Sequence, residues 1–243
     1  SKRDGDQGGF PIFPLNWTDP TNGQISNGYR ENGYSPEAFV NMLLLLGWSS
    51  GGEKELFSLE DAVEAFDLPG VIKSGARFNP DKARWFNEQY LRQAPVSDWL
   101  PAFREIASEL VSDWSDEKCL SALDMLLERV SFLHEVLDHT YVFEAPDTID
   151  EKLVAKKWKP ETSGYLTSLK EVLEQIEVFD SPSIEEAFKA FLEEKSLGFG
   201  AVLLPLRLVL TGAGGGPSMF DFAAFIGREE TLRRIDLGLA KVS

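Results

Sequence analysis

The segment with the most suggestive chemistry runs from Leu203 to Phe220. An apolar run in it carries one arginine, Arg207, and a cluster of four glycines closed by Pro217 separates that run from a second apolar stretch. Glycine lets the backbone turn tightly or approach a ligand closely. An arginine beside bare backbone could therefore hold a planar polar ligand. A core helix followed by a loose loop explains the same pattern, and the residues alone leave both interpretations open.

A second segment, residues 80–92, combines cations with aromatic and amide side chains. Spacings of three and four residues place four of them on one helix face: Lys82, Trp85, Gln89 and Arg92. Such a face suits a phosphate backbone, because cations contact phosphates and aromatic rings stack on bases. The alternative is a solvated face with Trp85 packed on a neighbouring domain.

Residues for catalysis or metal binding are few. His134 and His139 are five residues apart and do not share a helix face, and Cys119 is the only cysteine. We therefore expect no internal disulfide and no metal site. The glycine cluster lacks the Gly-Lys-Ser/Thr of a phosphate-binding loop, and no Ser/His/Asp or Cys/His set stands out. The residues alone indicate a helical module without a catalytic constellation, which could bind a polyanion.

The charge of the chain is strongly negative but uneven. A formal net charge of −16 over 243 residues argues against RNA binding by the whole surface, because phosphates repel acid. Residues 71–97 hold 5 basic and 2 acidic residues, and residues 198–243 hold 5 and 4. A polyanion could bind to such local patches. The absence of a long apolar run and of a secretory signal predicts a cytoplasmic chain without a membrane span, and Ser1 in place of Met suggests a piece, a processed form or a tagged form of a protein.

The fold class predicted from the pattern is mainly α with little β, because period-two alternation is almost absent. Residues 1–34 are expected to be irregular with short extended pieces. Helices are expected to start at Ser35-Pro36, Ser58 and Asn79-Pro80, and a capping box is expected at Ser183–Glu186. Other expected helical ranges are 98–144 throughout, 162–177, 183–195 and 228–240. The apolar run from Phe39 to Leu46 predicts a helix buried on most sides.

Three stretches resemble bacterial glutamyl-tRNA synthetase, a class I aminoacyl-tRNA synthetase, from the end of its catalytic core to its C-terminus. The first is Ser1-Lys2-Arg3-Asp4-Gly5-Asp6 with the following Phe10-Pro11-Ile12-Phe13-Pro14, similar to the tail of the family's signature loop. The second begins at Tyr29-Arg30-Glu31-Asn32-Gly33-Tyr34-Ser35-Pro36 and continues to Arg84-Trp85-Phe86-Asn87. The third is Leu204-Pro205-Leu206-Arg207 with Leu210-Thr211-Gly212. The three occur in the family's order.

The resemblance implies a fold and an activity. The implied fold is a stem-contact domain over 1–75 and a two-part helical cage for the anticodon, with its parts over 76–145 and 146–243. The intact protein would be a ligase of protein biosynthesis that attaches glutamate to tRNA(Glu) with ATP and Mg2+, as a monomer. This chain lacks the nucleotide-binding catalytic domain, so we expect it to be inactive alone and to hold no cofactor.

The resemblance also implies site residues. Lys2 matches a signature-loop lysine that holds ATP phosphates. The expected tRNA-binding residues are Lys82, Trp85, Asn87, Arg92, Arg207, Gly216, Pro217, Ser218 and Met219. Where some family members carry an arginine that tests the third anticodon base, this chain has Ser131, with Arg129 nearby. A non-discriminating enzyme that also charges tRNA(Gln) is therefore an alternative, and a non-catalytic helical interaction module is another.

Overall fold

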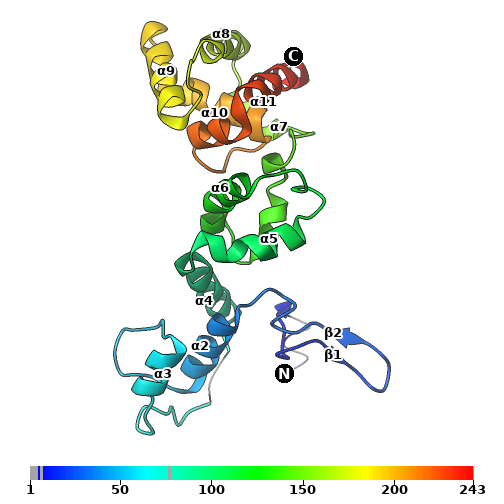
Figure 1. Ribbon diagram of the computed structural model, residues 1–243, viewed down its shortest axis with the longest axis vertical. Coiled ribbons are helices and arrows are strands. Elements are labelled where there is room, and N and C mark those ends of the chain that lie inside the picture. The colour runs from blue at the N-terminus through cyan, green and yellow to red at the C-terminus, as the bar shows by residue number, and fades with distance from the viewer. Residues whose placement is uncertain (1–4, 6–7, 76–77, 243) are drawn as a thin grey trace. The chain divides into compact units, whose positions relative to one another are not determined.

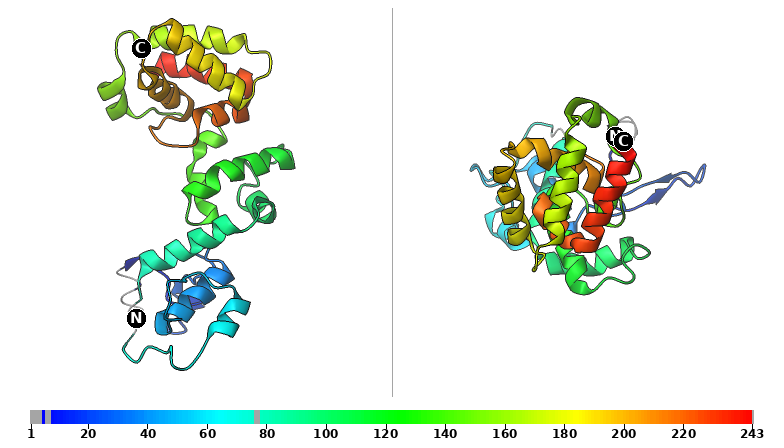
Figure 2. Two further views of the ribbon diagram at one scale, coloured as in Figure 1. Left: turned by 90° about the vertical axis from the view of Figure 1, so that its left-hand side faces the viewer. Right: turned by 90° about the horizontal axis from the view of Figure 1, so that it is seen from above.

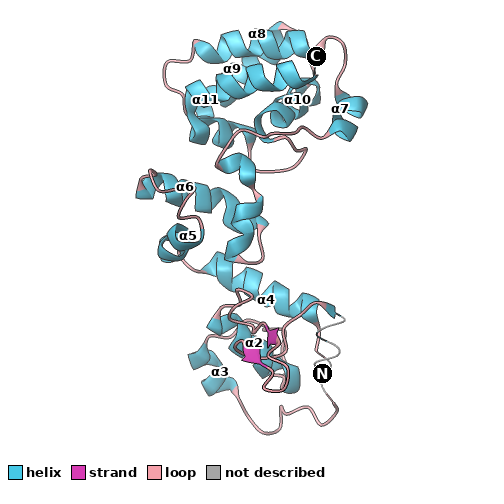
Figure 3. Ribbon diagram, turned by 90° about the vertical axis from the view of Figure 1, so that its right-hand side faces the viewer, coloured by secondary structure: helices cyan, strands magenta, loops and turns pink. Residues whose placement is uncertain are grey.

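The computed structural model describes residue 5, residues 8–75 and residues 78–242. It divides the chain into two compact units: unit 1 comprises Ser1–Ile106 and Val130–Val136, and unit 2 comprises Ala107–Arg129 and Leu137–Ser243. Helices dominate both units, and the short strands are confined to the N-terminal part (Figure 3). The prediction of a mainly α fold with little β is confirmed.

In its described residues, the first half of the chain carries a two-stranded sheet, four α-helices with defined bounds and one 3-10 helix. They are β1 (Trp17–Thr18), β2 (Ile25–Ser26), α2 (Pro36–Gly47), α3 (Leu59–Ala65), α4 (Pro80–Gln93), the 3-10 helix η1 (Val96–Trp99) and α5 (Leu100–Ile106). The two strands pair antiparallel, with Trp17 opposite Ser26. Irregular chain with short extended pieces is therefore confirmed for residues 9–34, whereas residues 5 and 8 are helical.

The second half is helical apart from its loops. Its elements are α6 (Asp116–Leu126), the 3-10 helices η2 (Leu127–Arg129), η3 (Leu133–Asp138) and η4 (Thr140–Val142), then α7 (Glu151–Lys157), α8 (Thr162–Glu174), α9 (Ser181–Glu194), α10 (Phe199–Thr211) and α11 (Met219–Val242). Figure 1 labels these elements along the chain.

Local capping starts the helices of unit 1 where the sequence predicts. The Ser35 hydroxyl accepts a hydrogen bond from the Ala38 amide at 3.1 Å, and Ser58 does the same for Asp61 at 3.0 Å. The Asn79 side chain accepts from two amides of the first turn of α4. Each cap satisfies amides that have no partner inside the helix, so the predicted starts of α2, α3 and α4 are confirmed.

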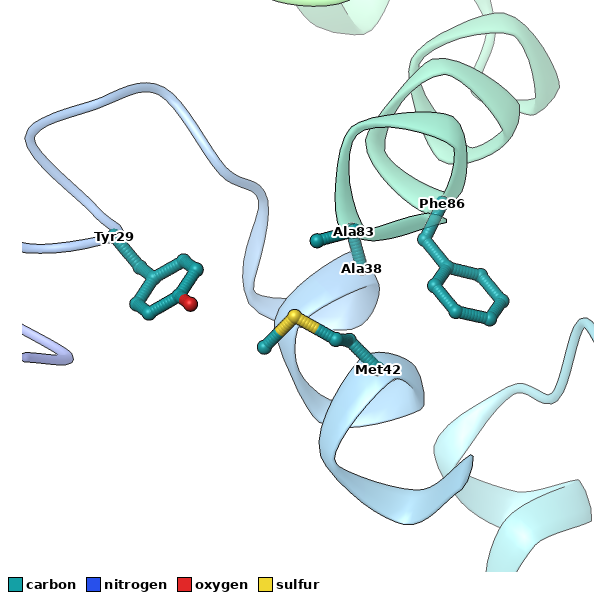
Figure 4. Close-up of a cluster of buried hydrophobic side chains, with 5 residues drawn as sticks. All are labelled: Tyr29, Ala38, Met42, Ala83 and Phe86. Atoms are coloured by element: carbon teal, nitrogen blue, oxygen red, sulfur yellow. The ribbon is translucent and has the colours of Figure 1, made fainter. Parts of the chain in front are cut away.

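The core of unit 1 forms where α2 packs on α4. Figure 4 shows Ala38 and Met42 of α2 facing Ala83 and Phe86 of α4, with Tyr29 approaching from the preceding loop. The rest of α2 does not follow the prediction of burial on most sides. Val40 and Leu43 are 41% and 49% exposed, because α4 covers one face of this helix and α3 only part of another.

In unit 2, α10 and α11 pack against α8 and α9. Figures 1 and 2 show these four helices side by side. Gly227 interrupts α11 with φ 82° and ψ 167°, values that only glycine adopts readily, so the predicted last helix at 228–240 is the second arm of a longer bent element.

Two sequence predictions need correction, one for a continuous helical range and one for a helix cap. Residues 98–144 are not helical throughout, because short 3-10 turns and loops separate α5, α6 and η2–η4. The helix expected at 183–195 starts at Ser181, and its N-cap is Asp180, whose carboxylate accepts from the Ser183 amide at 2.9 Å. Pro182 lies in the first turn, where its missing N–H costs nothing, so the cap must precede it and the predicted capping box at Ser183 is wrong.

Candidate nucleic-acid interface

The glycine-rich turn begins at the C-terminus of α10. Gly212 has φ 76°, the left-handed conformation that commonly ends a helix, and its amide bonds to the Leu208 carbonyl at 2.9 Å. A Cβ on Gly212 would lie 2.5 Å from the carbonyl oxygen of Thr148 and 2.9 Å from Cβ of Pro146. Glycine is therefore required here for both its conformation and its size.

A cavity of about 710 Å3 opens beside this turn, within unit 2. Its wall consists of Arg129, residues 138–141 and 144–148, residues 211–213, Gly215 and Gly216. The wall thus combines bare backbone from the turn with the side chains of η4 and its flanks. Cation, carboxylate, phenol and imidazole groups all reach it, which suits a polar ligand with several hydrogen-bonding edges.

Arg207 lies directly behind the turn. A Cβ on Gly216, whose φ is 141°, would lie 3.2 Å from Nη1 of Arg207 and 3.3 Å from Oη of Tyr141. Nη1 is buried and has no hydrogen-bond partner among the described residues. A buried donor without an acceptor is unfavourable by about 1–3 kcal/mol, more for a charged group. This donor lies next to Gly216, which lines the cavity, although Arg207 itself is not part of the wall.

Arg207 has two neighbours that influence its charge, Arg129 and Tyr141. Arg129 donates to the carbonyls of Met125 at 2.8 Å and Gly216 at 3.4 Å. Burial lowers the pKa of the Arg207 guanidinium, with Tyr141 acting in the opposite direction and Arg129 lowering the pKa further. Burial raises the pKa of Tyr141, while both arginines act to lower it. Oη of Tyr141 lies 3.2 Å from Nδ1 of His139, so phenol and imidazole are linked at the cavity wall.

Arg234 fixes this wall from inside. It is 2% exposed, and its guanidinium donates to the carbonyls of Tyr141 at 2.7 Å and Leu210 at 3.0 Å and to the carboxylate of Glu230 at 2.7 Å. One side chain thus joins η4, α10 and α11. Because hydrogen bonds to a buried charge are strong, Arg234 sets the position of Tyr141 relative to the end of α10.

The predicted residues of the turn divide into two groups. Ser218 is exposed and Gly216 is half-buried next to Arg207. Pro217 and Met219 are buried, and Met219 is only 2% exposed. Their side chains pack inside unit 2, so they shape the turn and are not on its surface.

The predicted residues of α4 also divide. Lys82 pairs with Glu55 and Arg92 with Glu88, both as partly exposed pairs, and Trp85 is half-buried against the core of unit 1. Asn87 is 2% exposed. It accepts from the Ser35 amide at 2.9 Å and donates to the Ser131 carbonyl at 2.6 Å, so the structure corrects the expectation that Asn87 lies on the surface.

Lys2 lies outside the described residues. Among the described residues no group of three or more His, Cys, Asp or Glu side chains is arranged to hold a metal ion. No helix in the described part of the chain has the length and apolar character needed to cross a bilayer.

Sequence reasoning found Arg207 and the turn but missed the other side of the cavity. Tyr141, His139 and Arg234 carry no local signal, because they reach the site from segments about 60 residues before α10 or about 20 after it. Arg129 was noted next to a position of the resemblance, and His139 only as a histidine that shares no helix face with His134. The exposed location of Arg129 at the cavity wall comes from the packing of η2 near the turn.

Comparison with known proteins gives a consistent picture. A family model described as anticodon binding domain matches residues 85–239, and one described as the catalytic domain of class I tRNA synthetases (E and Q) matches residues 21–85. A glutamate–tRNA ligase from Flavobacterium johnsoniae is 46% identical over 99% of this chain and 48% of its own length.

Solved structures of glutamate–tRNA ligases also match this chain. A crystal structure of a glutamate tRNA ligase from Elizabethkingia meningosepticum, in complex with its amino acid, matches with a TM-score of 0.95 at 43% identity, over 100% of this chain and 48% of that one. A glutamate-tRNA synthetase from Elizabethkingia anophelis matches at 0.91 and 41% identity, over 99% and 48%. The chain spans about half the length of the relatives it matches, and the predicted resemblance to glutamyl-tRNA synthetases is confirmed. Since the anticodon model covers more than half of the chain and includes Arg207 and the whole cavity wall, this chain belongs to the anticodon binding domain family.

Proposed function

We propose that this chain is the tRNA-binding part of a glutamate–tRNA ligase and that its unit 2 cavity reads an anticodon base of tRNA(Glu). The observation that carries the proposal is Nη1 of Arg207, which is buried without a partner among the described residues and lies behind the Gly216 turn. Unstacked RNA bases are recognised at their edges by arginine and by exposed backbone groups. Both are present at this cavity, inside the matched anticodon region.

The proposal for the intact protein follows from its relatives. We place the intact protein in the cytoplasm as a monomeric ligase that uses ATP and Mg2+ to attach glutamate to tRNA. The catalytic model matches only residues 21–85 here, so this chain should show no glutamate-dependent ATP–pyrophosphate exchange. Exchange above background in a preparation of this chain would refute that statement.

We assign roles to the other predicted tRNA-binding residues according to whether their side chains are exposed or buried. Lys82, Trp85 and Arg92 are proposed to contact the tRNA backbone from α4, because exposed ion pairs hold their cations by only about 0–1 kcal/mol and can exchange a carboxylate for a phosphate. Ser218 and Gly216 are proposed to contact an anticodon base. For the buried Asn87, Pro217 and Met219 we propose a supporting role.

The test compares tRNA(Glu) with the same tRNA changed at its second anticodon base. The wild-type chain should bind the unchanged tRNA more tightly, by about 1–3 kcal/mol or roughly 5- to 150-fold. Arg207→Ala should abolish that difference. Arg233→Ala is the matched control, since it removes the same charge from an exposed, paired side chain of unit 2 and should leave the difference intact. Equal binding of both tRNAs by the wild-type chain would show that the cavity does not read this base.

A specific observation bears on tRNA(Gln). Ser131 is buried, and its hydroxyl, amide and carbonyl bond to Arg84, Glu88, Glu135 and Asn87 within unit 1. Ser131 is therefore not proposed to test the third anticodon base. Arg129 is the exposed cation nearest that sequence position, and discrimination against tRNA(Gln) would have to use it. An Arg129→Gln variant that keeps the wild-type preference between the two tRNAs would exclude that role.

A further inference from the structure

Four lysines gather at α7 and the turn after it. Lys152, Lys156, Lys157 and Lys159, here called the α7 lysine cluster, are all exposed. No acidic residue occurs between Lys152 and Lys159. Lys152 and Lys156 are one helical turn apart, so their side chains leave α7 from the same face.

The cluster is unusual because its lysines have no partners. Elsewhere in the described chain most cations are paired, as Lys54 is with Asp61, Lys170 with Asp236 and Lys189 with Glu185. Within the described ranges, none of the four lysines of the cluster has an ion pair or a side-chain hydrogen bond. Asp150, Glu151 and Glu161 flank the cluster in sequence, but among the described residues none of them forms a salt bridge with it, so the four lysines make a local positive patch in a chain of net charge −16.

The start of α7 is attached to the cavity described above. The Asp150 amide, at the N-cap of α7, donates to the Gly212 carbonyl at 2.9 Å. Cδ1 of Leu153 lies 2.5 Å from where a Cβ on Gly214 would be, so Leu153 packs on the turn itself. At the other end, Nε1 of Trp158 donates to the Ser163 hydroxyl at 3.2 Å and fixes the turn that carries Lys157 and Lys159. The cluster therefore has a defined position beside the cavity, within unit 2.

We propose that the α7 lysine cluster binds the phosphate backbone of the RNA whose base enters the cavity. This inference rests on the proposed function and adds a second, sequence-independent contact to it. A lysine ammonium is a point charge on a flexible stem, which suits contacts to phosphates. An RNA held at the cavity continues along its strand, and unpartnered cations beside the cavity give that strand a favourable path.

The experiment measures binding of this chain to a hairpin RNA with the glutamate anticodon loop at several KCl concentrations. The test variant carries Lys152→Gln, Lys156→Gln, Lys157→Gln and Lys159→Gln. The control variant carries Lys54→Gln, Lys170→Gln, Lys189→Gln and Lys195→Gln, which removes the same total charge from paired lysines. A third variant with arginine at the four cluster positions keeps the charge.

The expected result is a shallower dependence of log K on log[KCl]. Each phosphate contact to single-stranded RNA contributes about 0.7 to that slope, so four contacts would reduce it by about 3. At 150 mM salt each contact corresponds to roughly a 4-fold change in affinity, and two contacts give more than 10-fold. The arginine variant should retain the wild-type slope. If the test variant has the same slope and affinity as the control variant, the inference is overturned and the cluster is only a solvated surface.

The design separates this inference from the proposed function. The ratio of affinities for the matched hairpin and one with a changed second anticodon base tests base reading, and the test variant should leave that ratio unchanged. A preserved ratio with an unchanged slope overturns only the lysine inference. A wild-type ratio of one, together with a reduced slope in the test variant, overturns the proposed base reading and supports the cluster as a backbone site.

Discussion

Replacing Gly212 by alanine should lower the stability of the cavity end of unit 2 more than a glycine-to-alanine substitution at any other position of the turn. The left-handed φ of 76° is unfavourable for alanine by about 1–2 kcal/mol. The added Cβ would lie 2.5 Å from the Thr148 oxygen, so the chain at 146–148 must move, and overpacking of this kind adds about 1–3 kcal/mol. Together these effects predict a loss of about 2–5 kcal/mol.

Gly215 provides the matched control. No atom lies within 4 Å of where its Cβ would be, and its φ is not in the left-handed region. Gly215→Ala should therefore change stability by less than about 1 kcal/mol, and in the stabilising direction, because alanine restricts the unfolded chain. Both glycines line the same cavity, so the pair separates backbone requirement from general disturbance of the turn.

Amide hydrogen exchange followed by mass spectrometry is the suitable assay, because it reports the opening free energy of each helix separately in a chain of two units. Peptides from α10 and from residues 146–153 should exchange roughly 30- to 4,000-fold faster in Gly212→Ala. Peptides from α2 and α4 serve as the internal reference. A loss below about 1 kcal/mol, or a loss equal to that of Gly215→Ala, would refute the steric and conformational argument.

Three further outcomes are expected. Arg234→Met should destabilise α10 and η4 by about 3–5 kcal/mol in the same exchange assay, because it removes a buried charge that bonds two carbonyls and leaves Glu230 with one partner fewer. Asn87→Ala should lower the urea midpoint of unit 1 by an amount equivalent to about 2–4 kcal/mol, yet leave the RNA affinity of the folded chain unchanged. Burial raises the pKa of Tyr29 from 10.0 to about 12, so its contribution to stability is fully present below pH 10 and is lost as pH rises through 12. Tyr29→Phe should remove that alkaline loss, measured as urea midpoints at pH 9 and pH 11.5.

Helix starts were predictable because their causes are local. Ser35, Ser58 and Asn79 each bond to amides no more than three residues away, so the sequence contains the complete interaction. The α9 cap shows the limit of this logic. Both Asp180 and Ser183 can accept amide hydrogens, and only the position of Pro182 within the first turn decides between them.

The candidate site was predictable only in its local half. Arg207 and the glycine turn are contiguous in sequence, whereas Tyr141 and Arg129 reach the cavity through packing of distant segments. Asn87 shows the opposite error. The resemblance implied a tRNA contact for it, but its side-chain amide bonds to the Ser35 amide and the Ser131 carbonyl, and a resemblance in sequence does not reveal these bonds.

The unpartnered Nη1 of Arg207 supports our proposal that this site is organised for a ligand and not for stability. Arginine remains protonated even when burial lowers its pKa, so the free chain keeps a buried positive charge with an unmet donor. The nearby Arg129 makes that charge less favourable still. An acceptor on a bound base would satisfy the donor, and phosphates on the α7 lysine cluster would reduce the local positive potential. Both effects are gained only on binding, so they favour the RNA complex without making the free chain more stable.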